Sequence, residues 1–198
     1  MNNLAKKFKQ TLKNNTHDPI LQGKIEIDEM YIHAGSKGIK KNEPRQRGLK
    51  IPGRGTYKND KPPIITIVEQ NTGYTIFSVE RQLSMQLIRH KVRKHCEQSV
   101  TVYTDEFPIY NGLKKLLKVD AHKTVTNSSN MYADGDVHVN NCENRHSLLR
   151  PFLNMYRGVS KKNLNTYVKF FQFIYNNGVN WTQKALQIIL TIPTHSQT

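Results

Sequence analysis

Cysteine is scarce in this chain, and the two that occur, Cys96 and Cys142, lie far apart without a second cysteine nearby. This spacing provides neither a CxxC zinc motif nor a disulfide framework, so we expect a reducing, intracellular setting. The opening residues, MNNLAKKFKQ, also lack the apolar core of a secretory signal. Together these absences predict a cytoplasmic protein.

Long apolar runs and acidic residues are scarce as well. No segment is apolar over the length needed to cross a bilayer, so we expect no membrane partner. Only 15 Asp and Glu accompany 30 Lys and Arg, which gives a formal net charge of +15 and a pI near 9.8. A surface this positive favours a polyanion, and nucleic acid is the partner we expect. A generically basic surface is the alternative.

The residues that are present fit one globular domain with short extensions. The chain of 198 residues has 36% hydrophobic side chains, which is enough for a sizeable core. Residues 1–22 are interpreted as a basic N-terminal helix, which is either a docking helix or a remnant of a DNA-binding region. Residues 23–178 form the globular body, and residues 179–198 form a tail with a short helix.

The body is organised around residues 23–35, GKIEIDEMYIHAG, an apolar strand pattern with acidic residues inside it. Because side chains alternate along a strand, Glu29 shares one face with Ile27, whereas Glu26 and Asp28 share the other. An ionised carboxylate in a half-buried strand needs a cation, hydrogen bonds or a raised pKa. We therefore expect a partner for Asp28 or Glu29 elsewhere in the chain.

The rest of the chain alternates between strand and helix patterns. The expected elements are, in order, a hairpin at 64–69 and 74–79, a helix that Ser84 caps, a strand over 99–107, a short helix near 113–117, a strand over 122–126, a helix from Asn140 that Pro151 interrupts or kinks, a long helix that Ser160 caps, and a short helix at 185–190. This order predicts an α/β fold in which helices cover a mixed sheet.

A basic segment, residues 33–61, lies between the first strand and the hairpin. It contains five glycines and nine Lys or Arg, so we expect a loop rather than a core element. Lysine and arginine in this loop suit contact with the backbone phosphates of DNA. A solvated insertion that touches nothing is the alternative.

Three acidic residues stand at the ends or faces of the expected elements: Asp28 on the first strand, Asp105 at the end of a later strand, and Glu143 on a following helix. They could converge at one edge of the sheet. Mg²⁺ prefers oxygen ligands and keeps positions for substrate phosphate. Two such ions about 3.5–4 Å apart can hold the attacking and leaving oxygens of a phosphoryl transfer. The residues alone thus indicate a metal-dependent phosphodiester enzyme.

Four segments in this order, IEIDEMYIHAG, GRGTYKNDKPPI, VYTDEFPIYNGL and YADGDVHVNNCENRHSLLR, resemble the DDE transposases of prokaryotic insertion sequences. The resemblance runs from about Leu4 to near Asn177, and it is greatest to the group whose intact members carry an N-terminal zinc ribbon and helix-turn-helix. It implies an RNase H-like fold for the globular body. It also implies that Asp28, Asp105 and Glu143 are catalytic and bind two Mg²⁺ or Mn²⁺ ions. The implied reaction cuts DNA at the element's ends, leaves a free 3′-hydroxyl and joins it to target DNA.

Further residues are predicted, from the resemblance and from charge, to contact DNA or to support the metal ligands. They are His138, Asn140, Arg150, Arg45, Arg47, Arg54 and Lys58. Family members usually have Lys where this chain has Arg150, and an aromatic residue where it has His146. A helix cap explains Asn140 equally well. We expect DNA as partner, both the element's ends and the target, and a homo-oligomer assembled on DNA.

Three neighbouring acids, Glu26, Glu29 and Glu106, are interpreted as solvated or salt-bridged groups rather than ligands. Two other functions stay open beside the transposase. The zinc ribbon and most of the helix-turn-helix do not precede residue 1 in this sequence, so the chain could be a catalytically silent DNA-binding remnant. It could also be an RNase H-like nuclease that acts on branched DNA or hybrids.

Overall fold

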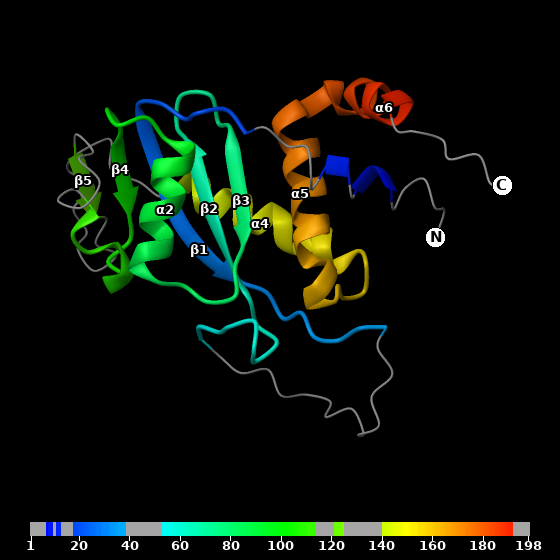
Figure 1. Ribbon diagram of the computed structural model, residues 1–198, viewed down its shortest axis with the longest axis horizontal. Coiled ribbons are helices and arrows are strands. Elements are labelled where there is room, and N and C mark those ends of the chain that lie inside the picture. Colours follow the sequence, from blue (N-terminus) through cyan, green and yellow to red (C-terminus); the bar gives the residue numbers. More distant parts are fainter. Residues whose placement is uncertain are drawn as a thin grey trace.

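A computed structural model describes residues 7–9, 11–12, 18–38, 53–113, 121–124 and 140–191. Within them, a five-stranded sheet forms the centre of the protein (Figure 1). Its strands are β1 (Lys24–Tyr31), β2 (Pro63–Glu69), β3 (Thr75–Val79), β4 (Thr101–Thr104) and β5 (Ala121–Thr124). They lie in the order β3-β2-β1-β4-β5. The pairs β1–β2 and β2–β3 are antiparallel, whereas β1–β4 and β4–β5 are parallel.

Helices cover both faces of this mixed sheet. Helix α2 (Met85–His95) packs on one face, where a first core cluster joins it to β1, β2 and β4. Helices α4 (Asn140–Asn154) and α5 (Lys161–Asn177) pack on the other face around a second cluster. A 3-10 turn, η2 (Gly178–Asn180), then leads into α6 (Trp181–Thr191), which packs against α5. The predicted α/β class, a mixed sheet covered by helices, is confirmed.

Alternation along β1 is as the sequence predicts. Ile25 and Ile27 are fully buried in the first core cluster, whereas Met30 belongs to the second. Strand β2 is buried along six of its seven residues because neighbouring strands flank it and helices cover both faces. Asp28 therefore lies on the same face as α4 and α5.

The hairpin and the start of α2 are confirmed, whereas other expected bounds differ. Strands β2 and β3 pair antiparallel, and the Ser84 side chain accepts a hydrogen bond from the Leu87 N–H at 3.2 Å, which caps α2. Strand β4 ends at Thr104, earlier than the expected strand over 99–107. The helix expected at 185–190 begins at Trp181. The short helix expected near 113–117 lies almost wholly outside the described residues.

Two details of the helices differ in part from the expectation. Pro151 does not interrupt helix α4, which runs through it to Asn154. Proline removes one backbone donor, but Leu149 and Leu153 on either side of it are buried in the second core cluster, so packing holds the helix together. Ser160 stands at the N-cap position of α5, yet its side chain makes no capping hydrogen bond.

Both described ends of the basic loop are tied to the body of the protein. The Ala34 N–H donates to the Asp60 carbonyl at 2.9 Å, and the Lys161 ammonium lies 2.6 Å from the Asp60 carboxylate. Gly55 allows the close approach at this base, because a Cβ atom there would lie 2.6 Å from the Lys61 carbonyl oxygen. Near the start of the loop, Lys37 donates to three carbonyls after α4, those of residues 156–158. The described residues at both ends of the loop are therefore held against the body of the protein.

Side chains from α5 close the outer edge of strand β3. The Gln172 side-chain oxygen accepts from the Phe77 N–H at 2.9 Å. The Asn176 amide accepts from the Thr75 N–H at 3.0 Å and donates to the Thr75 carbonyl at 2.8 Å. These contacts satisfy backbone groups that an edge strand would otherwise offer to another chain.

His95, at the last turn of α2, is expected to make the protein sensitive to acid. It is 7% exposed, and burial lowers its pKa to about 4. Because the pKa of His95 is lower in the folded protein, the unfolded chain binds a proton at higher pH than the folded protein does. The contribution of neutral His95 to the free energy of unfolding is therefore fully present above the ordinary pKa of 6.5 and is lost as pH falls toward 4. His95→Gln should therefore flatten the fall in stability between about pH 7 and pH 5 by on the order of 1–2 kcal/mol. Urea unfolding at both pH values measures this, and an equal fall in both proteins would contradict it.

Within the described part of the chain, the helices are too short or too polar to cross a membrane.

A candidate catalytic carboxylate site

Asp28 and Asp105 lie at the same edge of the sheet. Strands β1 and β4 are parallel neighbours, with Glu26 paired to Tyr103. The same register carried two residues further places Asp28 level with Asp105, directly after β4. Backbone donors hold both carboxylates: Asp28 accepts from the N–H of Glu29 at 2.7 Å, and Asp105 from the N–H of Phe107 at 3.0 Å. Adjacent parallel strands thus bring together two acids that are 77 residues apart in the sequence.

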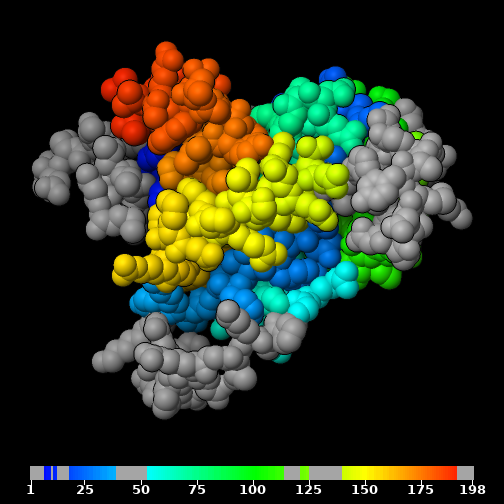
Figure 2. All heavy atoms as spheres, turned by 180° about the vertical axis from the view of Figure 1, so that it is seen from behind, coloured from blue at the N-terminus to red at the C-terminus, as the bar shows by residue number. Residues whose placement is uncertain are grey.

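Glu143 belongs to a helix that packs on the face of the sheet where Asp28 lies. It stands in the first turn of α4, which packs on β1 and β2. Figure 2 shows α4 running across this face, with part of the β1 segment visible between α4 and residues 53–60. Glu143 is exposed, so its side chain can change rotamer readily.

Burial and neighbouring carboxylates both act on the charge of Asp28. The pKa of Asp28 is raised to about 7, first because burial disfavours its charged form. The neighbouring carboxylates of Glu29, Asp105 and Glu143 raise it further, while the Glu29 N–H opposes them. The ionised form of Asp28 is therefore destabilised by its surroundings.

The donor chemistry of this site fits a hard divalent ion. Carboxylate oxygens are the ligands that Mg²⁺ prefers, and a bound cation would offset the cost of ionising Asp28. Among the described residues, no three His, Cys, Asp or Glu side chains already stand close enough to hold a metal ion.

His146 is a neighbour of Asp28 that charge and spacing did not reveal. It is 8% exposed, and its Nε2 lies 2.8 Å from the Thr66 hydroxyl. Its Nδ1 lies 3.6 Å from the Asp28 carboxylate. Burial, followed by the nearby Arg150 cation, lowers the His146 pKa to about 4, so the ring is neutral at pH 7. A buried imidazole offers no stacking surface to a base.

The acids around Asp28 differ in role. Glu26 is fully buried, so the expectation of a solvated group is wrong for it. The expected salt bridge of Glu29 is confirmed, since its side chain is 4% exposed and lies 3.4 Å from Arg54 Nε. It also accepts a 2.6 Å hydrogen bond from the Tyr110 hydroxyl. Glu106 is exposed, as expected. The alternation pattern placed Glu26 correctly, but it could not reveal its backbone partners.

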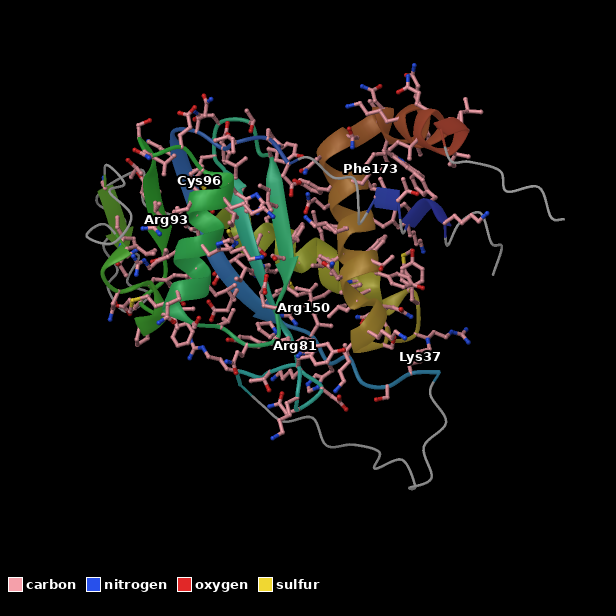
Figure 3. All side chains as sticks on the ribbon, viewed as in Figure 1. Lys37, Arg81, Arg93, Cys96, Arg150 and Phe173 are labelled. Carbon is pink, nitrogen blue, oxygen red and sulfur yellow. The ribbon has the colours of Figure 1, made fainter. Side chains whose placement is uncertain are left out.

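Four of the predicted DNA-contacting residues are exposed within the described part of the chain: Arg54, Lys58, Asn140 and Arg150. The Arg54 guanidinium stacks 3.6 Å above the ring of Phe107, two residues after Asp105. Arg150 lies on α4 and donates weakly, at 3.4 Å, to the Tyr31 carbonyl at the end of β1 (Figure 3). Two cations thus flank the carboxylate edge. The remaining candidates, His138, Arg45 and Arg47, lie outside the described residues.

The sheet order, with three antiparallel strands followed by two parallel ones and helices on both faces, is that of an RNase H-like fold. Residues 20–176 match the family model described as the ISXO2-like transposase domain, so the chain belongs to that family.

A curated relative from Halobacterium salinarum, named "Uncharacterized protein in transposable element ISH50", is 40% identical over 157 residues. The match covers 78% of this chain and 52% of the relative, so the chain spans about half the length of that protein. A solved structure titled as a simian T-cell lymphotropic virus intasome in complex with PP2A regulatory subunit B56 gamma contains a similar chain, with a TM-score of 0.45 and 12% identity. That likeness covers 92% of this chain and 54% of the other.

Proposed function

We propose that this chain is the catalytic domain of a DDE transposase, which cuts DNA at the ends of an insertion sequence and joins them to target DNA. The observation that carries the proposal is the parallel register of β1 and β4, which places Asp28 level with Asp105. The carboxylates of Asp105 and Glu143 both contribute to the raised pKa of Asp28. One of the proposed acids lies on β1, one directly after β4 and one in the first turn of α4. Membership of a transposase family supports the same function.

Asp28, Asp105 and Glu143 would hold two Mg²⁺ or Mn²⁺ ions. When bound, such ions neutralise charge that develops on the attacking and leaving oxygens of the phosphodiester. Arg54 and Arg150 flank the carboxylates and would bind the phosphates on either side of the reacting bond. Neutral His146 and the backbone donors of Glu29 and Phe107 would hold the two aspartates in place.

DNA binding in this proposal is mainly electrostatic. A net charge of +15 draws the DNA backbone toward a site that is itself acidic. Lys58 and Asn140 are exposed and would contact DNA phosphates. The proposal assigns DNA contacts to Arg45, Arg47 and His138 as well. We propose that two or more copies assemble on paired DNA ends, so that each end is held at a catalytic site.

A catalytically silent DNA-binding protein is the second candidate. The observation that favours it is that no three potential ligands in the described residues are already placed to hold a metal. Such a protein would keep the family's fold and positive charge without its chemistry.

One experiment separates the two candidates. The purified chain is incubated with duplex DNA that carries the element's ends, in Mg²⁺ or Mn²⁺, and the products are resolved on denaturing gels. A transposase should release ends with a 3′-hydroxyl and form joined products, and removal of the metal with EDTA should abolish both. Binding without cleavage in either metal would establish the silent alternative. Cleavage of hybrids or branched DNA without end specificity would indicate a nuclease.

A further inference from the structure

We propose that Glu26 is a positioning residue that locks the first turn of α4 onto strand β1 and so sets Glu143 opposite Asp28. This inference rests on the proposed function of those two carboxylates. Glu26 itself touches neither metal nor DNA in the proposal. Its role follows from four hydrogen bonds at a fully buried position.

The Glu26 carboxylate accepts hydrogen bonds at both oxygens. Oε2 accepts from the backbone N–H groups of Asn141 and Cys142, at 2.9 and 3.2 Å. Oε1 accepts from the side-chain amides of Asn141 and Gln70, at 2.7 and 2.9 Å. Four donors on two oxygens occupy the sites that a metal ion would need, so Glu26 is a tie between elements rather than a fourth ligand.

The partners explain why a buried carboxylate is tolerated here. The first N–H groups of a helix have no acceptor within the helix, and the helix dipole favours a negative charge beside them. Asn141 and Cys142 occupy the second and third positions of α4. Strand β1 thus supplies the acceptor for the N-terminus of a helix more than one hundred residues away.

The hydrogen bonds of Glu26 join the two elements that carry the proposed ligands Asp28 and Glu143. Glu26 is two residues before Asp28 on the same face of β1, and Cys142 immediately precedes Glu143. A shift of the first turn of α4 relative to β1 would therefore change the separation between Asp28 and Glu143 directly. Partners of this kind, one step removed from a metal, commonly set how tightly the metal binds.

Glu26→Gln tests the tie with little change in shape. An amide has one acceptor oxygen and two donor hydrogens, so donors from Asn141, Cys142 or Gln70 lose their acceptor. We expect the folded variant to bind Mn²⁺ about ten-fold more weakly than the wild-type chain, measured by calorimetric titration of the full chain without DNA. Glu26→Asp, which keeps the charge, should recover part of that affinity.

Asn176→Ala is the matched structural control. It also removes two hydrogen bonds between a helix and a strand, but those bonds lie at the β3 edge. It should lower the melting temperature while leaving Mn²⁺ affinity unchanged. Equal Mn²⁺ affinity in wild type and in folded Glu26→Gln would overturn the inference, and so would an equal loss in Asn176→Ala.

Two more variants cover the remaining outcomes. If Glu26→Gln does not fold, Gln70→Ala removes one of the four hydrogen bonds, the one whose donor lies outside α4. It should also weaken Mn²⁺ binding, but by less. Unchanged affinity in that variant would overturn the inference.

Asp28→Asn tests the proposed function separately. If Asp28→Asn binds Mn²⁺ as the wild type does, the carboxylate site itself is wrong. If Asp28→Asn loses Mn²⁺ and Glu26→Gln keeps it, only the positioning role fails.

Discussion

Asp28→Asn is expected to lower the rate of DNA cleavage by at least about a thousand-fold, because several kcal/mol of transition-state stabilisation depend on a correctly held metal. Asparagine keeps the size of the side chain but removes the charge that attracts the ion. The carboxylates of the other two proposed ligands both raise the pKa of Asp28. Single-turnover cleavage of end-containing DNA in Mg²⁺ measures the effect.

Two controls separate loss of catalysis from loss of fold. Glu106→Gln removes an exposed acid beside Asp105 and should cleave DNA at the wild-type rate. The pKa of Asp28 is raised to about 7, so its ionised form destabilises the metal-free fold, and this cost grows as pH rises from the ordinary value toward 7. Asp28→Asn should therefore melt at a higher temperature than the wild type at about pH 8 without metal. Wild-type cleavage by Asp28→Asn would rule out the carboxylate mechanism.

DNA affinity is expected to fall at least about a hundred-fold between 50 and 200 mM salt, because each phosphate that a Lys or Arg neutralises releases a counterion. The excess of 30 basic over 15 acidic residues makes this term dominant. Fluorescence anisotropy with a labelled duplex, measured over a series of salt concentrations, gives the slope. Affinity that hardly changes with salt would contradict electrostatic binding.

Arg54 allows that slope to be assigned to a place on the protein. Arg54→Ala removes an exposed cation beside Asp105 and should reduce the slope by about one unit. Lys184 is an exposed cation on α6, bonded to Asn177, and Lys184→Ala is the matched control. It should leave the slope unchanged. The same change of slope in both variants would mean that DNA does not bind preferentially at the carboxylate edge.

The sequence predicted the order of strands and helices because burial leaves periodic patterns. Alternation along residues 23–35 placed Asp28 on its face of the sheet, and the end of the next parallel strand placed Asp105 beside it. The ligand assignments remain proposals, since alternation and spacing say where side chains lie and not what they bind.

Features that depend on contacts between distant parts of the chain could not be predicted in the same way. The buried state of Glu26 depends on backbone donors of α4, which have no signature in residue type. The buried His146 ring has the hydroxyl of Thr66 on β2 as its hydrogen-bond partner. Pro151 has a strong local preference to end a helix, but the packing of its neighbours overrides it. Local patterns therefore predict the helices and strands, whereas contacts between distant residues determine which groups surround the candidate site.

The position of bound Mn²⁺ tests the metal-dependent mechanism most directly. Crystals of the chain soaked in Mn²⁺ should show anomalous density between the carboxylates of Asp28 and Asp105, with Glu143 turned toward it. Mn²⁺ at saturating concentration that binds elsewhere, or that leaves these three side chains without a shared ion, would contradict it.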